Sequence, residues 1–463
     1  MIALKREEVS ALAREAPEAL VNLVMVMQEK LAELTGQVAR LQQRVAELEE
    51  QNRPPSAPFR RREDERSASP KKPGRAPGHP GSCRRVPEQI DERIEVPLPC
   101  CPHCAGALEG VRPLVQYVEE IPPVRPHVTK LTTYEGQCPR CQRAVRSLHP
   151  MQTSTAGGCA GVQLGVRALA LAAELKHGMG LSLRKTQQVL AKLGGLHVTP
   201  GGLALAFQRM SAKLAGQDAA LRGQILQAPV VHTDETSWWV NGAQSLWVFV
   251  VPGSRGLTLY RVVPHRDRQT LHQIVPPDYQ GILISDCLSV YEGATPHQHK
   301  CYAHHLRALR TAKLHQHPQN AAASHWLADV NAFFRAAMEL KNDWETLSGE
   351  EQKTLRAQLE VFANRLFENP RADPAEERFR YRIAKQRDHL LSFLDHPAAT
   401  ATNNLAERQL RPAVIARKIS CGQKTARGAD AWQTLASLAA TCAQRAEDFA
   451  DFLRPHLCLS PAG

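Results

Sequence analysis

The spacing of apolar residues near the N-terminus is that of a long amphipathic helix. Apolar residues recur in alternating steps of four and three, at Leu20, Val24, Met27, Leu31, Leu34, Val38, Leu41, Val45 and Leu48. A heptad register in which branched residues face leucines favours a parallel two-stranded coiled coil. We therefore predict a coiled coil over residues 1–50 that joins two chains into a homodimer. A helix packed on the protein's own core is the alternative.

The apolar pattern then stops, and residues 51–90 are rich in Pro, Ser, Arg and Lys. Such a composition cannot form a core, so we predict a flexible basic linker here. Its charge would let it follow a phosphate backbone, although a solvated tether explains the composition equally well.

Two pairs of cysteines characterise the next segment, residues 91–150. They stand as Cys101-Pro-His-Cys104 and Cys138-Pro-Arg-Cys141. Two such turns, brought together, supply four thiolates, which is the ligand set of a closed tetrahedral zinc site. A closed site has no position left for a substrate, so we predict one structural zinc ion. Cys100 is an alternative to Cys101 as a ligand.

Helical periodicity returns over residues 151–226. Ser182 is placed to cap one helix, and Thr199 with Pro200 to begin another. The connection over residues 193–199 is compatible with a helix-turn-helix that reads DNA. Short helical hairpins are also common in proteins that never touch DNA, so both interpretations stay open.

From residue 227 the period changes to that of β-strands, and residues 227–304 are predicted to form the first part of an α/β core. The expected elements are three strands, a helix and a fourth strand, at Pro229–Thr233, Leu246–Val251, Leu257–Val263, Arg268–Val275 and Gly281–Ser285. The first three would form an antiparallel meander, and the helix would return the chain so that the fourth strand lies parallel to the first. Asp234 and Asp286 end the first and fourth strands. If these two strands are neighbours, the two carboxylates emerge side by side at one edge of the sheet.

This order of elements is that of the ribonuclease H-like fold. Two carboxylates held close together repel each other unless a cation lies between them, and magnesium prefers oxygen ligands. Such a site would still need a third carboxylate. Glu407 is a candidate, but its spacing from Asn404 also fits a helix capping box. Spacing alone does not choose between a metal ligand and a helix cap.

Composition narrows the partners and the location. Lys and Arg (58) exceed Asp and Glu (46), which gives a formal net charge of +12 and makes nucleic acid the leading partner. The N-terminus lacks the apolar core of a signal peptide, and no run of eighteen apolar residues occurs. We therefore expect a cytoplasmic protein with no membrane contact. Its 12 cysteines should be thiols or metal ligands.

Four motifs together resemble one protein family. They are Asp234-Glu-Thr, Ile284-Ser-Asp286, Cys301-Tyr-Ala-His304 and Asn403-Asn-Leu-Ala-Glu-Arg-Gln-Leu-Arg-Pro412. With the coiled coil, the linker and the four cysteines, they make nearly the whole chain similar to the IS66 family of bacterial insertion-sequence transposases. The resemblance implies that Asp234, Asp286 and Glu407 are the acidic triad of a DDE transposase. It also implies an all-helical insertion over residues 305–396, with residues 397–463 completing the core.

The resemblance further implies phosphoryl transfer on double-stranded DNA with two magnesium ions. Water would cut the strand at the terminal repeats of the element, and the freed 3′-hydroxyl would be joined to target DNA at the bacterial nucleoid. Accessory proteins could take part. Four basic residues on or just after the Glu407 helix would hold DNA phosphates or form an ordinary solvated face, namely Arg408, Arg411, Arg417 and Lys418.

Other interpretations fit some of the same residues. A ribonuclease H-like nuclease or resolvase would cut without joining, and a zinc-containing regulator would bind DNA without catalysis. Cys301 and His304 could bind a second metal or simply belong to a fifth strand and the helix after it. Trp238 and Trp239 could stack on an unpaired base or pack beside a hairpin.

Overall fold

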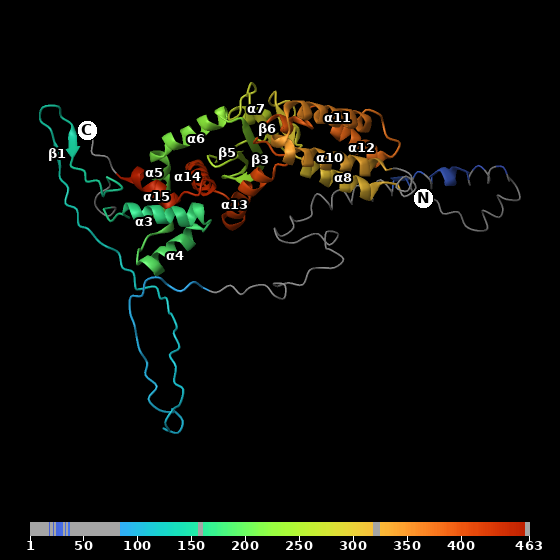
Figure 1. Cartoon of the computed structure of the whole chain (residues 1–463). Helices are drawn as coiled ribbons and strands as arrows, with labels where there is room; N and C mark the ends of the chain where they lie inside the picture. The colour runs from blue at the N-terminus through green and yellow to red at the C-terminus, as the bar shows by residue number, and fades with distance from the viewer. Residues whose placement is uncertain are drawn as a thin grey trace, which may run out of the picture. The chain divides into compact units, whose positions relative to one another are not determined.

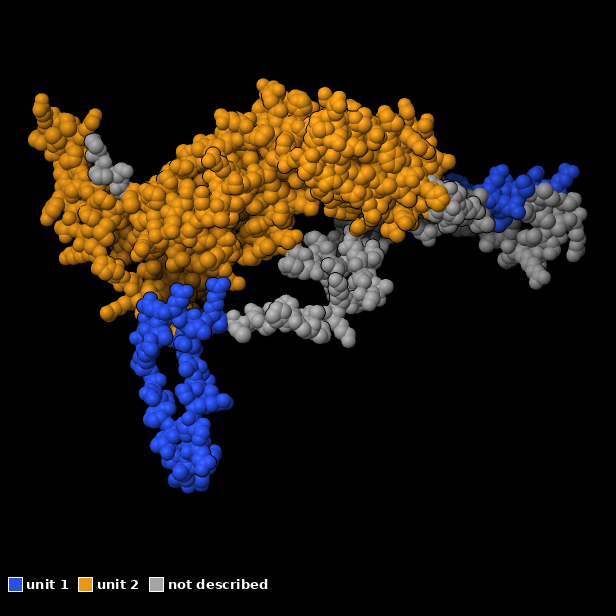
Figure 2. Space-filling model, in the orientation of Figure 1, with its two compact units in different colours: residues 1–119 blue, residues 120–463 orange. Residues whose placement is uncertain are grey.

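The computed structural model describes residues 84–155, 161–317 and 325–458, and in the N-terminal region only residues 18, 22, 25–30, 33, 36 and 37. These few N-terminal positions are helical and exposed. The rest of the predicted coiled coil, and the linker as far as residue 83, lie outside the described residues, so both stay predictions. The chain divides into two units, Met1–Glu119 and Glu120–Gly463, which we describe separately (Figure 1, Figure 2).

The two cysteine pairs lie in segments with little regular structure. In the first unit, residues 84–119 form neither helix nor strand apart from a tight turn after Cys101. In the second unit, the strands β1 (Glu135–Gln137) and β2 (Ala144–Arg146) pair antiparallel on either side of the second cysteine turn.

Within residues 161–227, all of which the structure describes, four helices precede the sheet. They are α3 (Val166–Ala173), which runs into a π-helical turn (Glu174–Gly178), α4 (Leu183–Gly194), α5 (Pro200–Lys213) and α6 (Ala215–Gln227). The hydroxyl of Ser182 accepts a hydrogen bond at the start of α4, and that of Thr199 does the same at the start of α5. Both predicted caps are confirmed. That α4 and α5 read DNA stays a prediction.

A five-stranded mixed sheet forms the centre of the second unit, in the order β5-β4-β3-β6-β7. Its strands, with the helix between β5 and β6, are β3 (Val230–Trp239), β4 (Ala243–Val251), β5 (Leu257–Val263), α7 (Arg268–His272), β6 (Ile282–Ser285) and β7 (Gln298–Lys300). The first three strands form the predicted antiparallel meander, and β6 pairs parallel with β3 and with β7. The predicted parallel orientation of the first and fourth strands is confirmed, and the two strands are neighbours.

Three predicted boundaries are wrong by three residues or more. β4 begins at Ala243 and not at Leu246. β3 does not end at Thr233 but continues to Trp239, because its pairing with β4 extends through a long hairpin as far as Trp239 and Ala243. Asp234 therefore lies within a strand, whereas Asp286 directly follows one, as predicted. Helix α7 ends at His272, so the residues up to Val275 lie outside it.

Long helices follow β7 and complete the unit. They are α8 (Tyr302–His315), α10 (Trp326–Asp343), α11 (Gly349–Phe367), α12 (Pro374–Ala384), α13 (Asn404–Ser420), α14 (Ala426–Gln444) and α15 (Phe449–Leu457), with short 3-10 turns at Ser289–Tyr291, Trp344–Thr346, Arg387–His389 and Ser392–Asp395. Helices α8, α10, α11 and α12 make up most of the described part of residues 305–396, where the all-helical insertion is expected. Their core includes Val230, Ile282 and Ile284 of the sheet, so this segment packs against β3 and β6.

Strand β5 is an edge strand of the sheet, and helix α14 covers this edge. Alternate backbone N–H groups of β5, at Thr258, Tyr260 and Val262, donate hydrogen bonds to the side chains of Thr441, Ser437 and Gln433. These three acceptors are spaced four residues apart on α14, so one helix face takes up the donors that an edge strand leaves free.

The helical insertion depends on a cluster of aromatic rings. Phe334 of α10 is fully buried and packs edge-on against Tyr302, with the two ring centroids 4.7 Å apart. Replacing Phe334 by Ala removes this contact and leaves a cavity, so the variant should destabilise the insertion by about 3–5 kcal/mol. Urea unfolding followed by tryptophan fluorescence measures this loss. Val361→Ala on α11, where the side chain is 69% exposed, should leave the unfolding midpoint unchanged.

Candidate active site

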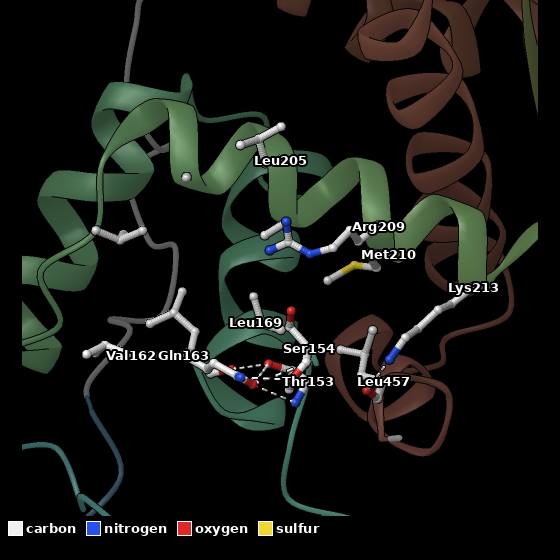
Figure 3. A pocket seen from close by; sticks show the side chains of 14 residues that line it. Thr153, Ser154, Val162, Gln163, Leu169, Leu205, Arg209, Met210, Lys213 and Leu457 are labelled. Carbon is white, nitrogen blue, oxygen red and sulfur yellow. Dashed lines mark hydrogen bonds between the residues drawn. The ribbon is translucent and has the colours of Figure 1, made fainter. Parts of the chain in front are cut away.

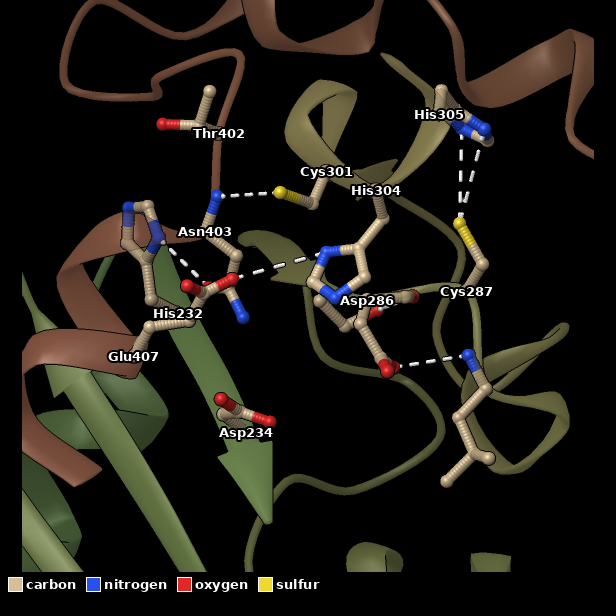
Figure 4. Close-up of polar contacts among 12 residues, drawn as sticks. His232, Asp234, Asp286, Cys287, Cys301, His304, His305, Thr402, Asn403 and Glu407 are labelled. Atoms are coloured by element: carbon tan, nitrogen blue, oxygen red, sulfur yellow. Dashed lines mark hydrogen bonds and ion pairs between the residues drawn. The ribbon is translucent and has the colours of Figure 1, made fainter. Parts of the chain in front are cut away.

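Three carboxylates from distant parts of the sequence meet beside the sheet. Asp234 is the fifth residue of β3, Asp286 follows β6, and Glu407 lies in the first turn of α13. The parallel register pairs His232 with Ile284, and extending it by two residues puts Asp234 level with Asp286. Figure 4 shows Asp234 on β3, with Glu407 and Asp286 around it. The structure therefore brings together the three acidic residues that the sequence predicts.

The charges of these carboxylates act on one another. Asp234 has its pKa raised from 3.8 to about 7, first by burial, then by the negative charge of the adjacent Glu235, and also by Asp286 and Glu407. Its Oδ1 accepts a hydrogen bond of 2.9 Å from the Glu235 N–H, which opposes this shift only in part. Without a cation, the site therefore resists full ionisation.

Glu407 is not a helix cap. The N-cap of α13 is Asn403, and it makes no side-chain capping hydrogen bond. Glu407 lies one position beyond the place that a capping box requires, and its Oε1 is buried without a hydrogen-bond partner. The capping-box alternative is therefore wrong, and the carboxylate is free to bind a ligand.

Asn403 attaches α13 to the sheet, a role that sequence reasoning did not assign. Its fully buried side chain donates a 2.8 Å hydrogen bond from Nδ2 to the Thr233 carbonyl and accepts one of 3.2 Å from His232 Nδ1. Burial lowers the pKa of His232 to about 4, so this ring is neutral at physiological pH. The Asn403 backbone N–H donates to the sulfur of Cys301, 3.1 Å away. Glu407, one helical turn later, is thereby held close to Asp234.

A second group of buried charges lies on the opposite side of β3 from Asp234. Glu235 is buried, pairs with Arg266, and accepts a hydrogen bond from the hydroxyl of Tyr291. Lys300, also buried, donates from Nζ to Ser285 Oγ and to the Tyr291 carbonyl, each at 3.1 Å. Burial lowers the pKa of Lys300 to about 8. These residues were missed; the signal available was a second acidic residue, Glu235, directly after Asp234, which the alternation of a strand turns to the opposite face.

Cys301 and His304 adjoin Glu407. Strand β7 and helix α8 flank Cys301 as the sequence predicted, and His304 lies in the first turn of α8. His304 Nδ1 is 3.8 Å from Glu407 Oε1, and burial lowers the pKa of its imidazole. Burial likewise raises the pKa of the Cys301 thiol, while backbone N–H groups around the sulfur lower it.

The four basic residues predicted to contact DNA all lie on α13. Arg408, Arg411 and Lys418 are exposed and recur at helical spacing, so they form one stripe that begins beside Glu407. Arg417 is turned toward β3 instead, where it donates a 3.0 Å hydrogen bond to Ser237. Whether any of them binds DNA stays a prediction.

The two tryptophans at the end of β3, Trp238 and Trp239, differ in burial. Trp238 is buried, packs on Trp432 with ring centroids 4.6 Å apart, and donates a hydrogen bond of 2.6 Å to Gln423. This confirms the packing interpretation for Trp238. Trp239 is 53% exposed, so stacking on a base stays a prediction for this residue alone.

The two cysteine turns have the same backbone geometry. In the first, the Ala105 N–H donates to the carbonyl of Cys101 at 2.8 Å; in the second, the Gln142 N–H donates to that of Cys138 at 2.8 Å. The two donor residues have left-handed φ values of 55° and 54°. Backbone N–H groups directed at the sulfurs lower the pKa of Cys101 and Cys138. Each turn belongs to a different unit, so the shared zinc ion, with Cys104 and Cys141 as further ligands, stays a prediction.

A cavity of about 270 Å³ lies away from the carboxylates. It is lined by Gln163, Leu169, Leu205, Arg209, Met210, Lys213 and neighbouring residues of α3, α5 and the segment before α3 (Figure 3). Lys213 is engaged there, because its Nζ donates to the carbonyl of Leu457 at 2.8 Å. None of the predicted site residues lines this cavity, so it does not change the choice of active site.

The raised pKa of Asp234 predicts a pH-dependent stability. The folded carboxyl keeps a proton up to about pH 7 that the unfolded chain releases near pH 3.8. Its contribution to stability is therefore full below pH 3.8 and lost as pH rises through 7. In buffer without divalent cations, Asp234→Asn should melt at a higher temperature than wild type at pH 8, and the difference should shrink toward pH 5. Asp278→Asn, on an exposed residue, should show no such trend, and an equal difference at both pH values for Asp234→Asn would contradict the assignment.

The comparison with protein families agrees with this arrangement. A family model described as Transposase IS66 family matches residues 161–431, a range that contains all three carboxylates. No curated protein matches the chain. Among the residues that the structure describes, no helix is long and apolar enough to cross a membrane. The matched range covers more than half of the 463 residues, and the chain therefore belongs to the IS66 family of transposases.

Proposed function

We propose that this transposase cuts DNA at the ends of an insertion element and joins the resulting 3′-hydroxyl to target DNA. The observation that carries the proposal is the meeting of Asp234, Asp286 and Glu407 beside the sheet, in the register described above. Family membership supports a transposase rather than a non-catalytic regulator. A nuclease that cuts without joining would share the same carboxylates. Formation of a joined product therefore distinguishes a transposase from such a nuclease.

The three carboxylates fit divalent cations. They offer only oxygen donors, which suit magnesium, and the raised pKa of Asp234 reflects a repulsion that a cation would relieve. When bound, two magnesium ions would activate the attacking water or 3′-hydroxyl and stabilise the leaving oxygen. Asp234 and Asp286 would hold such ions from adjacent strands, and Glu407 would hold them from α13.

Helix α13 supplies both a carboxylate and positive charge. The exposed stripe of Arg408, Arg411 and Lys418 starts one residue after Glu407. Phosphates bound along this stripe would set the position of the strand to be cut relative to the carboxylates. The terminal repeats and the target duplex would be the DNA partners, with a homodimer formed through residues 1–50.

Replacing Asp286 by Asn should separate cleavage from binding. The substitution keeps the shape of the side chain but removes its charge, so residue 286 should bind a divalent cation more weakly. Changing a group that only hydrogen-bonds to a metal ligand already costs about 10–100-fold in metal affinity or activity, and loss of a direct ligand should cost more. Release of 3′-hydroxyl ends from plasmid DNA carrying the element measures cleavage, and gel-shift titration measures binding.

The matched control is Asp278→Asn, on an exposed loop residue just before β6. It should cleave and bind like wild type. Asp286→Asn should bind DNA within about twofold of wild type, since one side chain away from the basic stripe is changed. Undiminished cleavage by Asp286→Asn would contradict the proposed role of this carboxylate.

A further inference from the structure

A second cluster of metal-ligating side chains adjoins the three carboxylates. Cys301, the N-cap of α8, and His304, in its first turn, meet Glu407 of α13. A sulfur, an imidazole nitrogen and a carboxylate oxygen all lie within 4.8 Å of one another. Figure 4 shows the His304 ring between Glu407 and Asp286. Three different kinds of donor therefore converge from two helices that are far apart in the sequence.

Two of the three donor atoms have no hydrogen-bond partner. His304 Nδ1 and Glu407 Oε1 are both buried and unpaired. Their separation of 3.8 Å is too long for a hydrogen bond between them. It is close to the distance of about 3.4 Å that separates two such ligands around one tetrahedral ion. A cation placed between them would satisfy both atoms.

The third donor atom, Cys301 Sγ, is surrounded by backbone N–H groups. Cys301 Sγ accepts the Asn403 N–H at 3.1 Å, and the N–H groups of Ala303 and His304 in the first turn of α8 are also directed at it. Burial raises the pKa of the Cys301 thiol overall and these N–H groups oppose the rise, so the thiol would lose its proton as a metal ion binds the sulfur. Such outer hydrogen bonds are typical of sulfur ligands in metal sites.

The donor types indicate which metal fits. Magnesium prefers oxygen, as in the pair Asp234 and Asp286, whereas a set of one sulfur, one imidazole and one carboxylate suits zinc and its neighbours. Three protein ligands leave one position of a tetrahedral shell for water.

We propose that Cys301, His304 and Glu407 bind one divalent transition-metal ion of the zinc or cobalt(II) class, beside the oxygen-only carboxylates. Glu407 has two carboxylate oxygens, so one can bind this ion while the other serves the site with Asp234 and Asp286. The ion thereby fixes the orientation of the third carboxylate. This consequence for cleavage rests on the proposed function, but the binding of the ion does not.

Zinc content of the full-length protein tests the site. Wild type and variants are purified with zinc, dialysed against metal-free buffer, and analysed by mass spectrometry for zinc per chain. His304→Ala should contain one equivalent less than wild type, and so should Cys301→Ser. The matched controls are His315→Ala, an exposed histidine at the end of α8, and Cys442→Ser, a buried cysteine of α14. Both controls should keep the wild-type zinc content.

A folding control, and the separation of zinc binding from DNA cleavage, make the zinc measurement interpretable. Cys301 is fully buried, so Cys301→Ser could misfold, whereas His304 is 24% exposed and circular dichroism can verify that His304→Ala is folded. Wild-type zinc content in folded His304→Ala would overturn the site, even if the variant cleaves DNA slowly. Asp234→Asn should keep its zinc. If wild type does not cut DNA but His304→Ala still contains less zinc than wild type, the proposed function is disproved and the metal site stands.

Discussion

The parallel pairing of β3 with β6 is the contact on which the rest of the site depends. Only three residue pairs make it, from Val230 with Ile282 to His232 with Ile284. A shift of one residue in this register would turn the side chains of β6 to the other face and move Asp286 out of line with Asp234. The burial of Val230, Ile282 and Ile284 under the helical insertion opposes such a shift. The core of the insertion therefore also fixes the spacing of two carboxylates.

The third carboxylate depends on a polar contact in place of a strand pair. Asn403 binds the Thr233 carbonyl and His232 through its side chain, and the Cys301 sulfur through its backbone N–H. These bonds join the start of α13 to β3 and to the start of α8, although the rest of the insertion separates the two helices in the sequence. Because buried polar groups are costly unless paired, this network has one favourable arrangement. Glu407 follows one turn later in a fixed position.

The strand order and two of the carboxylates could be predicted because they follow from local signals. Alternating and apolar runs located the strands, and the crossover rule made β3 and β6 parallel neighbours. The end of β3 could not be predicted, because its continuation past Thr233 depends on pairing with β4 across the sheet. The spacing of Asn404 and Glu407 fitted a capping box equally well, and only the tertiary contacts of Asn403 decide against it. The buried pair of Glu235 and Arg266, and the approach of Cys301 to Glu407, depend on contacts between distant segments that no local pattern records.

The most direct test of the account is whether Glu407 acts with the two aspartates in cutting DNA. The measurement is magnesium-dependent release of 3′-hydroxyl ends from a plasmid that carries the element with its natural flanks, for wild type and for Glu407→Gln. Glutamine preserves the size of the side chain and its place in α13 but removes its charge. We predict that wild type cuts at the flanks and that Glu407→Gln does not. Equal cutting by both proteins would contradict it.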